Sequence, residues 1–94
     1  MPEMPPNPEV ADTAPAEDIL TPYDREHAVT YMRMLDADAE SANWREVAEV
    51  VLGINPLRER DRARQAYETH LARAKWMSNR GYKLLLKHGW PVSN

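Results

Sequence analysis

The chain has 94 residues, a formal net charge of −3 and no cysteine, so it forms at most one domain and has no disulfide framework or thiolate site. No apolar run approaches the roughly 20 residues that span a membrane, and the proline-rich, acidic N-terminus is unlike a signal peptide. These features predict a cytoplasmic protein without a membrane segment.

The charge is divided unevenly along the chain. Residues 1–57 carry 3 basic and 12 acidic side chains, a net charge of −9, whereas residues 58–94 carry 9 basic and 3 acidic side chains, a net charge of +6. DNA-binding domains usually gather enough Lys and Arg to neutralise several phosphates. Only the last third of this chain has that composition, and the first part would repel a duplex.

Residues 1–20 contain five prolines, five acids and no basic residue. Such a segment buries too little apolar surface to offset the entropy lost on ordering. We therefore expect a disordered tail over residues 1–20, a helical domain over residues 21–90 and a flexible C-terminus over residues 91–94.

A first helix is expected from Pro22 to about Asp38. Thr21 can cap it, Pro22 suits the first helical position, and Asp24 lies three residues after the cap. The residues that fall on one face at helical spacing are Ala28, Tyr31, Met32, Leu35 and Ala39. Met34 and Val29 lie off that face, so we expect them to be exposed.

A second helix is expected from Trp44 to Leu52, capped by Asn43 and ended by Gly53, which adopts a left-handed conformation at little cost. Its inward face comprises Trp44, Val47, Ala48 and Val51, whereas Val50 falls among the polar residues. The following turn, which contains residues 54–57, is longer than that of a conventional helix-turn-helix.

A third helix begins between Pro56 and Asp61 and continues to about Asn79. Its apolar face comprises Ala63, Ala66, Tyr67, His70, Leu71, Ala74 and Met77. Arg80 and Gly81 are expected to cap it, and a short fourth helix follows from Tyr82 to His88. Because no strand-period alternation is present, the predicted fold is all-α, a three-helix helix-turn-helix with an extended turn and a short C-terminal fourth helix.

Nothing in the sequence has the pattern of a catalytic or metal site. The three histidines, His27, His70 and His88, fall on different helices without ligand spacing. The glycines are isolated, and no serine has a glycine elbow or a plausible base nearby. We therefore expect no catalytic residue, metal, cofactor or small-molecule substrate.

Binding to DNA and binding to protein are the two remaining alternatives. In a helix-turn-helix the second helix supplies the base contacts, which makes Arg58, Arg60, Arg62 and Arg64 the candidate DNA-binding residues. Five acids oppose this role because they lie near the surface that would approach phosphates. They are Glu46 and Glu49 on the preceding helix, and Glu59, Asp61 and Glu68 among the arginines.

Aromatic and methionine side chains that exceed the needs of a thin helical core favour a protein partner. The candidate partner-binding residues are Met34, Val50, Trp76, Tyr82 and Leu85. The alternative is that Trp76 and the leucines pack the fourth helix against the first.

The segment Trp44–Gly53, followed further along the chain by Gly81, Tyr82, Lys83, Leu84 and Leu85, resembles a family found in proteobacterial mobile elements. Its members are extended-turn helix-turn-helix domains of regulators of conjugative-element transfer, including FseA-type activators. The resemblance covers about residues 24–88.

The chain departs from those activators because it has a short acidic tail in place of a separate N-terminal domain. A lone, acidic copy of the domain is similar to QseM-type antiactivators. The resemblance implies a protein that binds a transcriptional activator of the same family, competing with the activator's own helical domain for its N-terminal domain, with weak or absent DNA binding.

Overall fold

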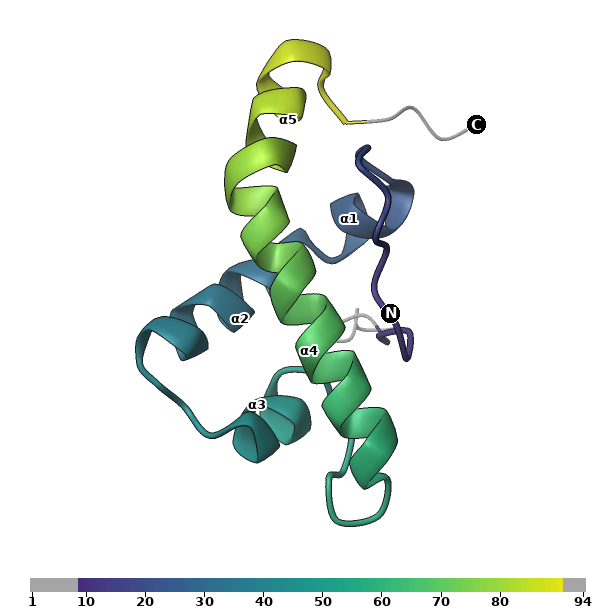
Figure 1. Ribbon diagram of the computed structural model, residues 1–94, viewed down its shortest axis with the longest axis vertical. Helices are drawn as coiled ribbons and strands as arrows, with labels where there is room; N and C mark the ends of the chain where they lie inside the picture. The colour runs from purple at the N-terminus through teal and green to yellow at the C-terminus, as the bar shows by residue number, and fades with distance from the viewer. Residues whose placement is uncertain (1–8, 91–94) are drawn as a thin grey trace, which may run out of the picture.

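The computed structural model describes residues 9–90, and the chain is helical over most of this range (Figure 1). In order the helices are α1 (Pro22–Glu26), α2 (Ala28–Ala39), α3 (Trp44–Val50), α4 (Arg60–Trp76), the π-helical turn η1 (Met77–Gly81) and α5 (Tyr82–His88). Residues 9–90 contain no strand, and the predicted all-α fold is confirmed. The C-terminus over residues 91–94, expected to be flexible, lies outside the described residues. Within the described range, no helix combines the length and the apolar character that crossing a membrane requires.

The predicted first helix is interrupted at one residue. Its start is as predicted: the Thr21 hydroxyl accepts a hydrogen bond from the Asp24 backbone N–H at 3.2 Å, and the Thr21 N–H donates to the Asp24 carboxylate at 2.9 Å. At His27, however, the backbone leaves the helical conformation, with φ −110° and ψ 19°, and separates α1 from α2.

The face that α2 buries differs from the predicted one. Met34, expected to be exposed, is 1% exposed, whereas Met32, expected to be buried, is 64% exposed. Both expectations are wrong. The buried face also contains the polar Thr30. A search for an apolar stripe therefore favours the face of Met32 over the face of Met34. Val29 is exposed, as predicted.

The second helix and the extended turn follow the sequence closely. The Asn43 side chain accepts a hydrogen bond from the Arg45 N–H at 2.8 Å at the start of α3, and Gly53 beyond its end has φ +72°. The turn between α3 and α4 spans residues 51–59 and buries Leu52 and Ile54 against the core.

The core forms where α4 packs against α2 and α3. Three alanines of α4, Ala63, Ala66 and Ala74, are completely buried. Because their side chains are small, the neighbouring helices can approach α4 closely. The larger core side chains come from the other elements and include Tyr31, Met34, Val47, Leu52 and Ile54.

The third and fourth predicted helices form one continuous rod, because α4 passes through η1 into α5 (Figure 1). Gly81 has helical dihedrals, φ −61° and ψ −39°, so the expected cap at Arg80 and Gly81 is wrong. A Cβ atom on Gly81 would lie 2.8 Å from Met77 Sδ and 2.8 Å from Trp76 Cζ3. This glycine therefore leaves room for the two side chains to pack against the rod instead of ending it.

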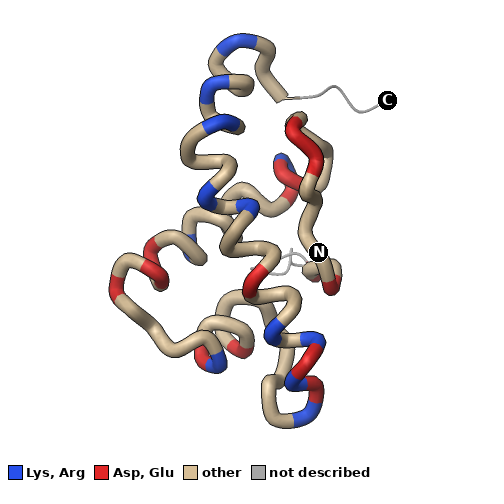
Figure 2. Tube along the Cα trace, viewed as in Figure 1, with Lys and Arg blue, Asp and Glu red and all other residues tan. Residues whose placement is uncertain are grey.

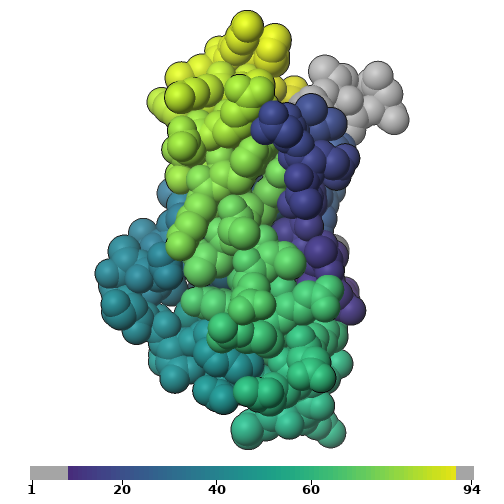
Figure 3. Space-filling view, in the orientation of Figure 1, coloured from purple at the N-terminus to yellow at the C-terminus, as the bar shows by residue number. Residues whose placement is uncertain are grey.

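Residues 9–20, hereafter the N-terminal arm, lie alongside α4 in an irregular conformation (Figure 3). Val10 and Ala14 are buried, and several polar contacts join the arm to α4. The structure differs here from the disordered tail expected over residues 1–20, of which residues 1–8 lie outside the described range. The arm contacts side chains that are distant in sequence, as Ala14 does with Thr69, so local composition gives no sign of its partners.

Candidate functional site

A buried ion pair joins α1 to the last turn of α4. Arg73 donates to the two carboxylate oxygens of Asp24 at 2.9 and 2.7 Å, and the side chains are 2% and 0% exposed. The Tyr31 hydroxyl donates to the same carboxylate at 2.7 Å. The sequence alone gives no sign of this pair, because Asp24 lies on α1, far from Arg73 in the chain.

The carboxylate of this pair remains ionised. Burial alone would raise the pKa of Asp24, but the hydrogen bonds from Arg73 and Tyr31 and the backbone N–H of Thr21 outweigh it, so the pKa lies below its ordinary value of 3.8. Burial raises the pKa of the Tyr31 hydroxyl, and donation to Asp24 raises it further. The pair is a fixed structural element, since both oxygens of the carboxylate are engaged.

A second series of hydrogen bonds lies near this ion pair and includes the buried His70. His70 Nδ1 lies 2.7 Å from the Ala66 carbonyl oxygen, which can only accept, so Nδ1 carries the proton. Nε2 of the neutral ring then accepts from the Tyr23 hydroxyl at 2.6 Å, and that hydroxyl accepts from the Ala11 N–H at 2.9 Å. Burial lowers the pKa of His70, against the opposing effect of the Ala66 hydrogen bond.

One flank of the rod carries polar side chains at steps of three or four residues, which place them in a single line along the helix. We call this line the α4 stripe; it consists of Arg62, Gln65, Thr69, Arg73, Trp76 and Arg80. Every member contacts the N-terminal arm. Sequence reasoning missed the stripe, although the regular spacing of its polar residues was available as a signal.

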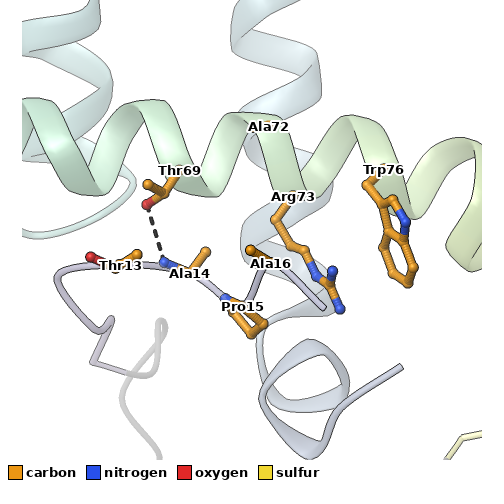
Figure 4. A pocket seen from close by; sticks show the side chains of 8 residues that line it. All are labelled: Thr13, Ala14, Pro15, Ala16, Thr69, Ala72, Arg73 and Trp76. Atoms are coloured by element: carbon orange, nitrogen blue, oxygen red, sulfur yellow. Dashed lines mark hydrogen bonds between the residues drawn. The ribbon is translucent and has the colours of Figure 1, made fainter. Parts of the chain in front are cut away.

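A cavity of about 280 Å³ lies between the arm and the stripe (Figure 4). It is lined by Thr13, Ala14, Pro15, Ala16, Thr69, Ala72, Arg73 and Trp76. Its lining is mostly small and apolar. The arm is therefore held to α4 by polar contacts at points along its length and not by continuous packing.

The four candidate DNA-binding arginines do not form an array of free cations. Arg62 is paired with Asp12 and Glu59. Arg64 is paired with Glu68 at 2.9 Å, and its guanidinium stacks over Trp44 at 5.0 Å. Arg58, in the turn, and Arg60, at the start of α4, are exposed and form no ion pair among the described residues.

The charges of the helix-turn-helix itself cancel. Residues 44–68 contain five arginines and five acids, and Figure 2 shows the two signs alternating around the start of α4. Residues 69–90 contain five basic side chains and no acid. The cationic end of the domain is therefore α5, not the helix-turn-helix.

The structure separates the five candidate partner-binding residues. Met34 is in the core, so it is not available to a partner in this structure. Val50 is 56% exposed on α3, at the opposite end of the domain from α5 (Figure 1). Trp76 lies at the end of α4, where it is half-buried and donates to Asp18 of the arm, whereas Tyr82 and Leu85 lie on α5, with Tyr82 54% exposed.

Comparison with known proteins assigns the chain to a family. Residues 8–87 match the profile of the RovC DNA-binding domain, described as "T6SS, Transcription factor, DNA binding domain". The chain belongs to this family. No curated protein matches the sequence.

Membership of the RovC DNA-binding domain family identifies a domain of transcription regulation, and the family is not one of enzymes. Within residues 9–90 no group of three or more metal-ligating side chains occurs. The candidate recognition surfaces of the domain are the exposed arginines of the turn and α4, the α4 stripe, and α5.

Proposed function

We propose that this protein regulates transcription as an antiactivator. It would bind a transcriptional activator of the same domain family and inhibit it, competing with the activator's own helical domain for its N-terminal domain. The observation that carries the proposal is the charge balance of the helix-turn-helix, where five acids offset five arginines over residues 44–68.

Affinity for DNA arises mainly from cations that displace counterions from the phosphates. In this domain Arg62 and Arg64 already pair with acids of the same chain. Glu46 and Glu49 are exposed on α3, the helix that crosses the DNA backbone in a helix-turn-helix. These features support a domain that keeps the shape of a DNA-binding module without its attraction to phosphate.

The docking surface that we propose is α5. Its main contacts within the domain are with η1, and it leaves Tyr82 54% and Leu86 70% exposed, one helical turn apart, beside the half-buried Leu85. Large apolar and aromatic side chains that lie together on a surface are typical anchors of protein interfaces.

Direct DNA binding is the second candidate function, and the family match favours it. It would use Arg58, Arg60, Arg62 and Arg64 at the start of α4. Arg58 and Arg60 have the exposure that this role requires.

A two-part experiment distinguishes the candidates. The protein is tested by pull-down against the family activator encoded nearest to its own gene, and by fluorescence anisotropy against that activator's promoter DNA at about 150 mM salt. We expect capture of the activator and no salt-sensitive DNA binding. Tight promoter binding that weakens steeply with salt would overturn the proposal in favour of the second candidate.

The α5 surface is tested with Leu86→Asp. The matched control is Val29→Asp, which places the same charge at a similarly exposed apolar position on α2. We expect Leu86→Asp to reduce activator capture at least about tenfold, as for an interface anchor, and Val29→Asp to leave it unchanged. Equal effects of the two variants would exclude α5 as the docking surface.

A further inference from the structure

The contacts between the N-terminal arm and the α4 stripe follow the same order along both segments. Asp12 pairs with Arg62, the Thr13 hydroxyl accepts from Gln65, and the Ala14 N–H donates to the Thr69 hydroxyl at 3.1 Å. The arm therefore runs parallel to α4, and it occupies the first half of the stripe as an extended peptide.

The arm also binds the second half of the stripe, which consists of Arg73, Trp76 and Arg80. Arg73 donates to the carbonyl oxygens of Glu17 and Ile19 at 2.6 and 2.7 Å. Asp18 accepts from the Trp76 indole N–H at 3.0 Å and from Arg80 at 3.2 Å. Each of the six stripe side chains thus binds a carboxylate, a hydroxyl or a backbone group of one extended acidic segment.

We infer that the α4 stripe is a binding site for extended acidic peptides, which the N-terminal arm of the same chain occupies and which an acidic segment of another protein can occupy in its place. The inference concerns a surface distinct from the exposed face of α5, and it holds whether or not the protein is an antiactivator.

The chemistry of the stripe favours a peptide over a nucleic acid. Arg73 is buried and already neutralised by Asp24, which leaves Arg62 and Arg80 as the cations that face an incoming ligand. Two cations are few for binding to a phosphate backbone. The Thr69 hydroxyl accepts a backbone N–H, a donor that an extended peptide presents at every residue except proline and a phosphate backbone lacks.

The arm is bound weakly enough to exchange. The carboxylates that hold its two halves are largely solvent-exposed, 62% for Asp12 and 66% for Asp18, and ion pairs of this kind contribute little to stability. The cavity of about 280 Å³ beneath the arm shows that packing between the arm and α4 is incomplete. Val10 and Ala14 are the buried side chains of the arm, and a segment with so few of them opens at lower cost than the helical core.

The arm also controls the charge that a ligand meets. The arm holds four acids and no base, whereas residues 21–94 carry a net charge of +2. Displacing the arm therefore turns a surface that repels an acidic segment into one that attracts it.

The test uses the full chain and a fluorescein-labelled peptide with the sequence of residues 9–20. Asp12→Asn with Asp18→Asn removes the two carboxylates that hold the arm, at exposed positions where folding is unaffected. The matched control is Glu26→Gln with Glu40→Gln, which changes the net charge equally at exposed sites away from the stripe. Thermal unfolding verifies that all variants are folded.

We expect the arm variant to bind the peptide roughly tenfold more tightly than the control variant, since two exposed ion pairs of the competing arm are lost. Adding Arg62→Gln and Arg80→Gln to the arm variant should remove this gain. Equal peptide binding by the arm and control variants would overturn the inference. A gain in binding to a random-sequence DNA duplex without a gain for the peptide would also overturn it, because the stripe would then be a nucleic-acid surface.

Discussion

A basic side chain of the long helical rod is buried in its middle, whereas others are exposed at its C-terminal end. Around Arg73 the rod is enclosed by α1, α2 and the arm, and its guanidinium is paired with Asp24 inside the domain. Around Lys83 and Lys87 the rod has few neighbours other than η1, and these cations and Leu86 face solvent. The Arg73 pair therefore stabilises the middle of the rod from within the domain, whereas the side chains at its end remain exposed.

The largest expected effect tests the enclosed region. Asp24→Ala leaves the Arg73 guanidinium buried without its partner and removes half of the capping box of α1, so we expect the free energy of unfolding to fall by about 3–5 kcal/mol. Chemical denaturation measures it. Glu26→Ala, an exposed acid of the same helix, is the control and should change the value by less than about 0.5 kcal/mol. Similar losses in the two variants would contradict the assignment of Arg73 to the core.

A smaller effect is expected at the junction of the two regions. In Gly81→Ala the new methyl group meets Trp76 and Met77 at 2.8 Å. We expect a net loss of about 1 kcal/mol, because overpacking outweighs the better helix propensity of alanine. The tryptophan fluorescence should change as the Trp76 ring is displaced. Ser78→Ala, at an exposed position of η1, is the control. A more stable Gly81→Ala variant would indicate that the two regions are not tightly joined.

The enclosed region also predicts a dependence on pH. Burial holds the pKa of His70 below its ordinary value of 6.5, so the unfolded chain binds a proton more readily than the folded domain. Stability is then fully present above pH 6.5 and decreases as the pH falls below it. His70→Gln, which preserves a donor and an acceptor, should flatten the dependence of the thermal-unfolding midpoint on pH between about pH 7 and pH 5. An unchanged slope would contradict the neutral, buried ring.

The smallest expected effect is at the exposed end. Leu86→Asp should change the free energy of unfolding by less than about 0.5 kcal/mol, because the side chain is 70% exposed. A loss of several kcal/mol in chemical denaturation would show that α5 packs against the domain, and the contrast between the two regions of the rod would not hold.

The parts of the fold that could be predicted are those determined by neighbours in sequence. The capping residues Thr21 and Asn43 start helices as expected, Gly53 ends one, and the alanine face of α4 forms the core. In each case the decisive interactions lie within a few residues of one another, where propensity and spacing apply.

The parts that could not be predicted depend on partners distant in sequence. Arg73 resembles any exposed arginine until Asp24 is placed beside it, and the acids of the arm resemble a disordered tail until Arg62 and Arg80 are aligned with them. The α4 stripe could not be predicted for the same reason. Its regular spacing alone does not indicate that the arm binds along it.

A buried polar face accounts for the remaining difference. The face that α2 and its cap bury contains His27, Thr30, Tyr31 and Met34. Because two of these residues are polar, a search for an apolar stripe selects the adjacent face, and with it Met32.

The π-helical turn η1 sets the rotation of α5 relative to the rest of the rod. A π-helical turn closes hydrogen bonds five residues apart, one more than an α-helix, and each residue of an α-helix turns the chain by about 100°. Closing η1 into an α-helical turn without removing a residue would therefore rotate α5 and place Tyr82 where Lys83 is now and Leu86 where Lys87 is now. The π-helical hydrogen bonding of this five-residue turn thus determines the direction in which the exposed Tyr82 and Leu86 point.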